Sequence, residues 1–316
     1  MRVIFMGTPA FAVKTLHKII EAGHEVIAVY TQPDKPKGRG KSVSFTPVKE
    51  VAVTHDIPVF QPTKIREPEQ IERIQNLKPD VIVVVAFGQI IPKAILNIPH
   101  YGCINVHASL LPKYRGAAPI QWAIIDGEEV TGITTMRMDA GLDTGDMILK
   151  EEVLIGEKET NESLFEKLSA VGGDLLIKTL EQIQKGTAVY EKQEESPTPY
   201  AKMLQKEMGI IDWNKSAKEI ERQIRGMNPW PSAYTYLGGK TLKIWKADVI
   251  TDTIKKTDAK SGEIIFTDKK NIIVKTKDGV LALKEIQLEG KKRMDTEVFL
   301  LGYKIEIGEV LEHSKE

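Results

Sequence analysis

Residues 80–87, DVIVVVAF, form a nearly continuous run of apolar and mostly β-branched side chains. Such a run is typical of a strand in a parallel sheet that helices cover on both faces. Two further strands are predicted upstream, at 2–6 (RVIFM) and 24–30 (HEVIAVY). The segments between these strands have helical patterns at 7–20, 46–55 and 67–77. Strands that alternate with helices predict an α/β domain with a Rossmann-like, mostly parallel, doubly wound sheet.

The alternation continues downstream of this strand. In the helix predicted at 7–20, upstream of this strand, Thr8 is the predicted N-cap and Pro9 is the first helical residue. Beyond residue 87, two more strands and two more helices are predicted: strands at 102–109 and 131–138, and helices at 118–127 and 161–186.

Periodicity is lost between residues 187 and 209, where Pro197 and Pro199 lie. One amphipathic helix follows at 216–227, and then short strand-like runs separated by turns, at 232–237, 240–250, 262–267, 271–277 and 279–288. Several short strands of this kind predict a C-terminal OB-like β-barrel domain. We therefore predict a first domain at 1–188, a linker at 189–206 and a second domain at 207–316.

The composition limits the class of protein. Lys plus Arg and Asp plus Glu both number 44, so a polyanion would have to bind through a local cluster of positive charge. Cys103 is the only cysteine, so no intrachain disulfide forms and a reducing compartment is expected. The chain has no window of 18 apolar residues and no pattern of a signal peptide. These observations predict a cytoplasmic protein that has no membrane partner.

A cluster of polar residues ends the predicted strand at 102–109. Asn105 and His107 are two residues apart, so their side chains leave the strand on the same face. Open α/β sheets bind their ligands at the carboxyl ends of such strands. The segment MDAGLDTGD at 138–146 also follows a strand and carries three aspartates. A carboxylate from this segment beside His107 would orient the imidazole, and Asn105 would donate to a developing oxyanion.

Taken alone, His107 is better interpreted as a structural histidine and Asn105 as a turn residue, and the neighbouring aspartates are what favour a functional role. The chain has no serine in a nucleophile elbow, no cysteine in a catalytic setting and no metal-ligand spacing. It also lacks the G-x-G-x-x-G and P-loop motifs, which argues against a dinucleotide or nucleoside triphosphate site. A donor, an imidazole and a carboxylate without a nucleophile favour group transfer between two bound substrates.

Two motifs together, INVHASLLPKYRGAAPIQWAI at 104–124 and GLDTGDM at 141–147, resemble the folate-dependent formyltransferase family. Further segments extend the resemblance over nearly the whole chain: FMGTPAFAV, VVVAFGQIIP and IRGMNPWPSAYT. The resemblance implies an enzyme that transfers a one-carbon group, in which Asn105, His107 and Asp143 are the catalytic residues.

The family's formyl donor is 10-formyl-tetrahydrofolate, and the resemblance implies no metal. It implies that a free primary amine attacks the formyl carbon while Asn105 and His107, held by Asp143, stabilise the oxyanion. It also implies which residues contact folate: Ser109, Leu110, Leu111 and Pro112 in the turn after the strand, Phe87, Gly88, Gln89 and Ile90 on one side of the pterin pocket, and the backbone from Asp139 to Leu142 on the other.

The segment 31–49 is longer than the roughly 2 to 6 residues that usually connect elements in α/β units. Its positive residues are Lys35, Lys37, Arg39, Lys41 and Lys49, and the segment is either a solvated loop or a surface for phosphates. Within the family, the chain is most similar to members that formylate methionyl initiator tRNA. That resemblance implies that Arg39 contacts the tRNA, and Lys37, Lys41, Lys202 and Lys206 are further candidates for tRNA contacts. A protein that presents one long channel to RNA is expected to be a monomer.

Three other functions remain open at the level of sequence. A formyltransferase that acts on the amine of a nucleotide sugar shares the same motifs, but the basic segment 31–49 argues against it. A formyltetrahydrofolate hydrolase would need neither this segment nor a second domain of this size. A non-catalytic RNA-binding protein would not need Asn105, His107 and Asp143 together.

Overall fold

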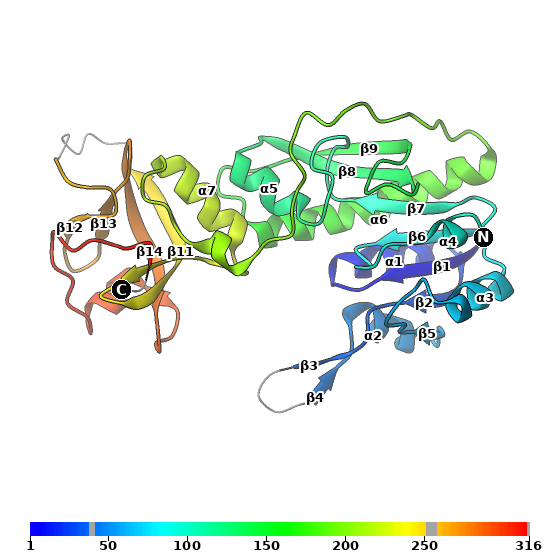
Figure 1. Ribbon diagram of the computed structural model, residues 1–316, viewed down its shortest axis with the longest axis horizontal. Coiled ribbons are helices and arrows are strands. Elements are labelled where there is room, and N and C mark those ends of the chain that lie inside the picture. Colours follow the sequence, from blue (N-terminus) through cyan, green and yellow to red (C-terminus); the bar gives the residue numbers. More distant parts are fainter. Residues whose placement is uncertain (38–41, 251–257, 315–316) are drawn as a thin grey trace. The chain divides into compact units, whose positions relative to one another are not determined.

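The computed structural model describes residues 1–37, 42–250 and 258–314. By its packing the chain divides into two compact units (Figure 1). The first consists of residues 1–119, 130–154 and 165–201, and the second consists of residues 120–129, 155–164 and 202–316. The chain passes finally from one unit to the other after Ala201, which lies inside the predicted linker at 189–206. The domain bounds 1–188 and 207–316 stay a prediction.

The first unit is built on a seven-stranded sheet in the order β5-β2-β1-β6-β7-β8-β9. The strands from β5 to β7 are parallel, and β8 and β9 are antiparallel to their neighbours. The predicted α/β fold with a mostly parallel sheet is thus confirmed. The strand bounds are β1 Arg2–Gly7, β2 Glu25–Tyr30, β5 Val59–Phe60, β6 Val81–Val85, β7 Cys103–His107, β8 Val130–Arg137 and β9 Met147–Leu154.

Helices cover both faces of this sheet. On one face Ile74 of α3 and Ile95 of α4 share a buried cluster with Ile4, Ile82 and Cys103 from three strands. On the other face α1 and α6 pack together through the rings of Phe11 and Phe165, whose centroids are 5.2 Å apart. All five residues of β6 are buried, which agrees with the apolar run that predicted it. The helix bounds are α1 Phe11–Glu21, α2 Pro47–Thr54, α3 Pro68–Leu77, α4 Lys93–Leu96, α5 Pro119–Asp126 and α6 Asn161–Lys185.

The predicted N-cap of the first helix is wrong. The helix α1 begins at Phe11 after Ala10, which makes no side-chain cap bond. The Thr8 hydroxyl instead donates to the carbonyl oxygen of Phe87 at 3.0 Å, so a tertiary contact uses the group that a cap would need. Local sequence cannot distinguish these uses because a Thr hydroxyl serves both equally well.

The basic segment at 31–49 contains a two-stranded hairpin, β3 Lys35–Lys37 and β4 Ser42–Ser44. Its base is closed by the Thr31 and Thr46 hydroxyls at 2.8 Å and by an ion pair between Lys49 and Asp34. Gln61 joins this ion pair, because its side-chain oxygen accepts from Lys49 at 2.8 Å and its amide donates to Asp34 at 2.8 Å. Lys49 therefore belongs to the anchor of the hairpin and not to its free positive charges.

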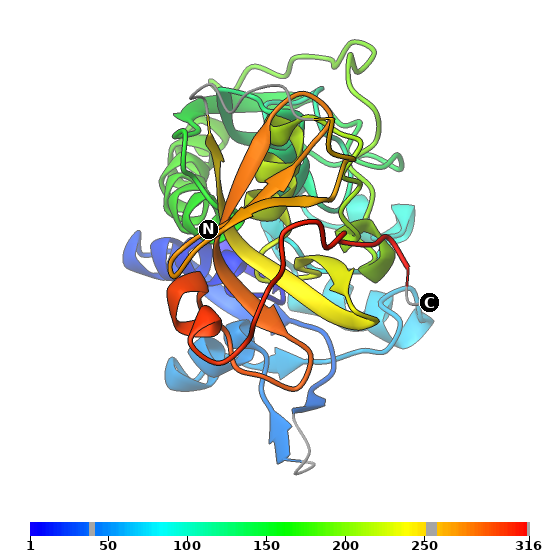
Figure 2. The ribbon, with the colours of Figure 1, turned by 90° about the vertical axis from the view of Figure 1, so that its left-hand side faces the viewer.

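The second unit contains an antiparallel sheet in the order β10-β11-β14-β13-β12, with β15 beside β14. Residues near the C-terminus pair with both edges of this sheet, because Glu312 bridges Tyr236 of β10 and Val310 bridges Glu263 next to β12 (Figure 2). This pairing closes the sheet into a small barrel, as the strand pattern predicted. The bounds are β10 Ala233–Leu237, β11 Lys240–Ile250, β12 Ile264–Thr267, β13 Ile272–Lys275, β14 Val280–Leu288, β15 Met294–Asp295, α7 Ala217–Met227 and α8 Thr296–Leu300.

The sheet of the second unit packs around Trp213, which is completely buried. Helix α7 contributes Ile220 and Ile224 to this core and begins with a capping box between Ser216 and Glu219. Within the described parts of both units, no helix is long and apolar enough to cross a membrane.

Candidate active site

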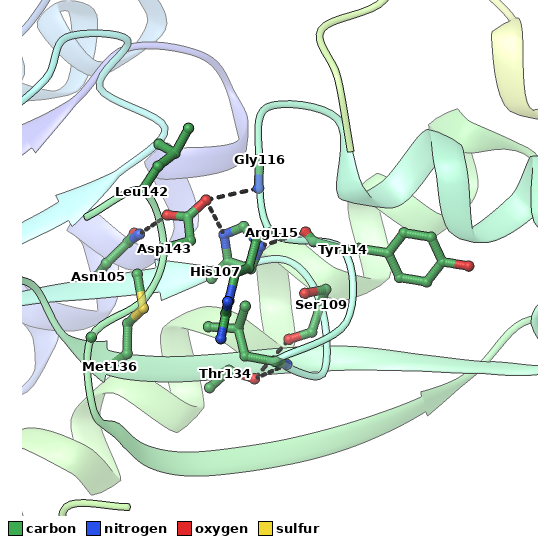
Figure 3. A network of polar contacts seen from close by, with 12 residues as sticks. Asn105, His107, Ser109, Tyr114, Arg115, Gly116, Thr134, Met136, Leu142 and Asp143 are labelled. Carbon is green, nitrogen blue, oxygen red and sulfur yellow. Dashed lines mark hydrogen bonds and ion pairs between the residues drawn. The ribbon is translucent and has the colours of Figure 1, made fainter. Parts of the chain in front are cut away.

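Strand β7 presents Asn105 and His107 on one face, as their spacing predicted. The residue between them, Val106, lies toward α6 on the opposite face, where its side chain is 3.0 Å from the position that a Cβ of Gly172 would take. His107 is the last residue of the strand and is only 6% exposed. The pair therefore sits where the strand gives way to the turn that follows it (Figure 3).

Asp143 also lies next to His107, but it belongs to a loop. It does not follow the carboxyl end of a strand that is parallel to β7. Because β8 is antiparallel to β7, the chain leaves β8 near the start of β7, where the Met138 amide donates to the carbonyl of Cys103 at 2.8 Å. The loop 138–146 then turns back along the sheet and brings an Asp143 oxygen to 3.8 Å from Nδ1 of His107. A carboxylate of segment 138–146 does lie beside His107, as predicted. The loop brings it there by turning back along the sheet, and not by the adjacency of two strand ends.

The carboxylate of Asp143 joins three parts of the site (Figure 3). Its Oδ2 faces His107 and accepts a hydrogen bond from the Gly116 amide at 2.9 Å. Its Oδ1 lies 3.5 Å from the side-chain nitrogen of Asn105. Asp143 itself has a backbone φ of 55°, a left-handed conformation that costs free energy in a residue other than Gly. Contacts elsewhere must therefore hold this loop.

The two nitrogens of the His107 ring have different partners. Nε2 lies 3.0 Å from the carbonyl oxygen of Tyr114, which only accepts hydrogen bonds, so Nε2 carries a hydrogen and donates it. That contact assigns the tautomer and leaves Nδ1, on the side of Asp143, as the nitrogen that can act on a substrate.

The turn after β7 uses its polar groups internally. The Ser109 hydroxyl donates to the Lys113 carbonyl at 2.6 Å, and Thr134 bridges the carbonyl of Ser109 and the amide of Leu111. The side chains of Ser109 and Leu111 are buried, whereas those of Leu110 and Pro112 are half-buried. The folate contacts predicted for this turn stay a prediction, with Leu110 and Pro112 as the side chains nearest to solvent.

The loop after β6 is held by three glutamine and threonine side chains. The Phe87 carbonyl accepts from Thr8 at 3.0 Å and from Gln32 at 3.2 Å. The side chain of Gln89 bonds to the Ile65 amide at 2.7 Å and to the Pro62 carbonyl at 2.9 Å, so its polar end is occupied within the fold. Phe87 is buried in the core, and Gly88 has a φ of +85°. Gln89 and Phe87 thus shape this wall of the predicted pterin pocket and do not offer free polar groups to it.

One exposed apolar side chain marks each predicted wall of the pterin pocket. Ile90 is 84% exposed and Leu142 is 57% exposed. Asp139 folds the second wall, since its carboxylate accepts from the Gly141 amide at 3.0 Å and from the Thr144 hydroxyl at 2.8 Å. Exposed apolar side chains on both walls fit the apolar faces of a flat heterocycle.

The segment 190–201, here called the strap, supplies site residues that the sequence analysis missed. The backbone of Glu191 pairs with Met147, and that of Ala201 pairs with Arg115, Ala117 and Ala118. Between these ends, Gln193 and Tyr200 bind the loop 138–146: Gln193 donates to the Asp143 and Gly145 carbonyls, and the Tyr200 hydroxyl donates to the Leu142 carbonyl at 2.7 Å.

The strap looks like a linker in the sequence because it has no periodicity and two prolines. The strap is held by hydrogen bonds to backbone groups at 115–118 and 142–147, which are far away in the sequence. Local sequence therefore carries no sign of this order. Burial, and after it the Asp143 charge, raises the pKa of Tyr200 above its ordinary value, so its hydroxyl keeps the proton that it donates.

The predicted tRNA-binding residues do not all fall in the described part of the chain. Lys37 is the last residue of β3, whereas Arg39 and Lys41 lie outside the described residues. Lys202 and Lys206 are exposed in the second unit, where the Lys202 carbonyl accepts from the Trp122 ring at 2.8 Å. In residues 1–37, 42–250 and 258–314, no group of three or more His, Cys, Asp or Glu side chains could hold a metal ion.

Comparison with known proteins decides the family. Residues 1–180 match the formyl transferase model, and residues 203–304 match the formyl transferase C-terminal domain. The chain belongs to the formyl transferase family. A methionyl-tRNA formyltransferase of Agathobacter rectalis is 59% identical and covers 98% of each chain. The methionyl-tRNA formyltransferase of Lachnospira eligens is 56% identical over 98% of this chain and 99% of its own.

Solved structures share the fold of this formyl transferase at low sequence identity. A Helicobacter canadensis N-formyltransferase in complex with folinic acid and dTDP-3-aminofucose has a TM-score of 0.68 and 20% identity, covering 90% of this chain and 99% of its own. HypX from Aquifex aeolicus, solved in complex with tetrahydrofolic acid, has a TM-score of 0.63 and 17% identity, covering 98% of this chain and 50% of its own.

Proposed function

We propose that this formyl transferase moves the formyl group of 10-formyl-tetrahydrofolate to the amino group of methionyl initiator tRNA. The observation that carries the proposal is the meeting of Asn105, His107 and Asp143 at the end of β7, in a chain similar over its whole length to proteins named methionyl-tRNA formyltransferase. The product is N-formylmethionyl-tRNA, which is used to initiate translation.

The reaction balances without a protein nucleophile. The amine nitrogen forms a bond to the formyl carbon, and the carbonyl π electrons move to oxygen. The resulting oxyanion collapses as the bond from the formyl carbon to N10 of the folate breaks. N10 takes up one proton and the amine gives up one, which leaves the formylated amine and tetrahydrofolate.

In this proposal Asn105 and His107 face the oxyanion. The Asn105 amide has two hydrogens, and only one of them is directed to Asp143, so the second is left for the substrate. His107 acts through Nδ1 because its Nε2 donates to the Tyr114 carbonyl. Asp143 lies beside Nδ1, and from this nitrogen a protonated imidazole donates to the oxygen on which negative charge develops. We propose that the proton of the amine leaves through a water near Asp143.

On the acceptor side, the β3–β4 hairpin and the exposed Lys202 and Lys206 are proposed to contact phosphates of the tRNA. Arg39 and Lys41 complete this proposed set. The second unit also has a pocket of about 600 Å³ whose lining includes Lys206, Lys243, Tyr234 and Tyr236. Aromatic and basic side chains together are typical of surfaces that bind single-stranded nucleic acid. We further propose that the enzyme is a monomer in the cytoplasm.

The amine of a nucleotide sugar is the competing acceptor, because the Helicobacter canadensis structure contains one. At 20% identity that structure supports the shared fold and not a shared acceptor. The relatives named methionyl-tRNA formyltransferase are similar over both matched regions, including residues 203–304.

One experiment compares the acceptors directly. The protein is incubated with 10-formyl-tetrahydrofolate and, in parallel, with methionyl initiator tRNA, methionyl elongator tRNA, dTDP-3-aminofucose or water. Formylated methionine released by mild hydrolysis of the tRNA is measured, together with tetrahydrofolate. We expect rapid formylation of the initiator tRNA alone. Formylation of the amino sugar, or release of tetrahydrofolate in water at the same rate, would overturn the proposal.

A further inference from the structure

We propose that Gln193, in the strap at 190–201, is a positioning residue that holds the Asp143 carboxylate in its reactive place. The inference rests on the proposed function, because Asp143 is the residue whose position matters. The proposal gives the strap a role in catalysis, although its sequence pattern is typical of a linker.

The side-chain amide of Gln193 binds two backbone carbonyl groups of the loop 138–146. Its nitrogen is 2.9 Å from the carbonyl oxygen of Asp143 and 2.7 Å from that of Gly145, so each amide hydrogen has an acceptor. Its oxygen accepts from Nε of Arg115 at 2.9 Å. Arg donates only, so this contact settles which end of the amide is nitrogen. All the hydrogen-bonding groups of this side chain are used in holding protein atoms.

The backbone of the loop needs such support. Asp143 is in the left-handed region at φ 55°, and Gly145 is so close to the Arg137 carbonyl that a Cβ would lie 1.9 Å from it. Two hydrogen bonds from one amide hold these two positions, which lie on either side of Thr144. The direction of the Asp143 side chain follows from its backbone, so Gln193 sets the distance from the carboxylate to His107 without touching a substrate.

Arg115 extends the support to the other side of the carboxylate. It donates to the Gln193 oxygen and, through Nη2, to the Glu194 carbonyl at 2.9 Å. Its neighbour Gly116 donates its amide directly to Asp143 at 2.9 Å. The strap therefore links the two segments that together fix Asp143, and Gln193 is where the link is made by a side chain.

The test uses the full chain and three variants. Gln193→Glu keeps the shape and the Arg115 partner but turns an oxygen toward two carbonyl oxygens. Gln193→Met keeps the volume and removes three hydrogen bonds, the two to the loop and the one from Arg115. Glu195→Gln, at an exposed position of the same strap, is the matched control. A misplacement near 1 Å costs up to about 10²-fold in rate, so we expect kcat to fall by about 10-fold to 10²-fold in Gln193→Glu and by less in Gln193→Met.

Two readouts separate positioning from general damage. The KM for 10-formyl-tetrahydrofolate and the melting temperature should stay close to those of the control. The amide proton of Gly116, observed by NMR with its nitrogen labelled, should move upfield in Gln193→Glu because its hydrogen bond to Asp143 is lost. This signal reports the position of Asp143 in the free protein, whichever acceptor the enzyme uses.

Each outcome decides the matter. An unchanged Gly116 signal in Gln193→Glu would overturn the inference even if the initiator tRNA proved not to be the acceptor. A fall in kcat accompanied by an equal rise in KM and a loss of melting temperature would also overturn it, since that pattern indicates a structural role. A moved Gly116 signal in a protein that does not formylate methionyl-tRNA would support the role of Gln193 and contradict only the proposed function.

Discussion

His107 is held at one ring nitrogen and faces Asp143 with the other. Its Nε2 donates to the Tyr114 carbonyl at 3.0 Å, and its Nδ1 lies 3.8 Å from Asp143. The first contact prevents the ring from turning, and the second places a carboxylate beside Nδ1, the nitrogen that we propose acts on the substrate. A ring fixed in this way loses no time or free energy in reorientation when charge develops on the substrate.

Replacing His107 with Ala should lower kcat by about 10²-fold to 10³-fold, the usual effect of losing one donor to an oxyanion. Binding of tetrahydrofolate, measured by fluorescence titration, should change little because no role in folate binding is assigned to His107. Single-turnover formylation under saturating donor gives the rate. A variant that keeps the wild-type kcat would exclude His107 from the chemistry.

Gly116 combines a special backbone with a close neighbour. Its φ is +124°, and a Cβ there would lie 2.6 Å from the Ala201 carbonyl. Gly116→Ala should therefore destabilise the protein by about 1–3 kcal/mol and displace the amide that donates to Asp143. Both the melting temperature and kcat should fall.

Gly186→Ala is the matched control for that variant, because Gly186 also has a positive φ, of +68°, but nothing within 4 Å of its added Cβ. It should lower the melting temperature and leave kcat unchanged. If Gly186→Ala reduced kcat as much as Gly116→Ala, strain alone would account for the result and the close contact with Ala201 would be irrelevant.

Single residues differ in how far the sequence predicts them. Asn105 and His107 share a face because strands alternate with a period of two, so their pairing follows from local sequence. Asp143 was identified through the family resemblance, since three aspartates lie in one loop and nothing local distinguishes them. Gln193 was missed because its partners, Arg115 and Asp143, are far away in the chain.

Among the elements, the β3–β4 hairpin stands on a compact anchor. Burial by itself would raise the pKa of Asp34, but hydrogen bonds from Lys49 and Gln61 outweigh it and hold that pKa below its ordinary value. The pair is also largely shielded, since each side chain is about 15% exposed. The ion pair between Asp34 and Lys49 thus anchors the base of the hairpin.

Asp34→Asn should loosen the hairpin and raise the KM for methionyl-tRNA several-fold, because loop ordering would then have to accompany tRNA binding. The KM for 10-formyl-tetrahydrofolate should not change. Glu50→Gln, which removes a charge from an exposed position on the neighbouring α2, serves as control. Equal effects of both variants on the two substrates would argue that the anchor has no part in tRNA binding.

Elements with a strong apolar pattern were predicted correctly, as the five buried residues of β6 illustrate. Strand β9 was not predicted, because Lys150, Glu151 and Glu152 interrupt its pattern at the edge of the sheet. An edge strand needs to bury only part of its side chains, so charged residues are tolerated there. The hairpin of β3 and β4 was read as a loop because both strands are only three residues long.

At the scale of the whole molecule, two buried ionisable groups in the first unit set the response to alkali. Burial raises the pKa of Tyr30 to about 12, and burial also raises the pKa of the Cys103 thiol to about 12. The unfolded chain ionises these groups near their ordinary pKa values of about 10 and 8.5. The free energy of unfolding should therefore decline as pH rises from about 9 to about 12, because the unfolded state loses protons first.

Tyr30→Phe tests this dependence. Within the described structure the Tyr30 hydroxyl is buried without a hydrogen-bond partner, so removing it should cost little at pH 8. At pH 11 the variant should be more stable than the wild type, because its unfolded state has one group fewer to ionise. Urea unfolding of both proteins, followed by circular dichroism at the two pH values, gives the comparison. A difference that is the same at both values would contradict the assignment.

The patterns on either side of residues 187–209 differ in kind, which is why two domains were predicted, but no such pattern indicates that residues 120–129 and 155–164 belong to the second unit. The way in which the second sheet closes was not predictable, since residues 310–312 contribute only isolated bridges and have no strand pattern of their own. The chain has 44 residues of each charge sign, so its net charge does not indicate an RNA substrate. The formyl acceptor had to be predicted from local features alone.

The strap also bears on how the chain can be cut into transferable modules. It lies after the matched region 1–180 and before the matched region 203–304, so neither contains it. A chimera of two relatives joined at residue 180 would take the loop 138–146 from one parent and Gln193 from the other. A junction after Ala201 keeps both from one parent, and this is where second domains should be exchanged between family members without loss of the chemistry.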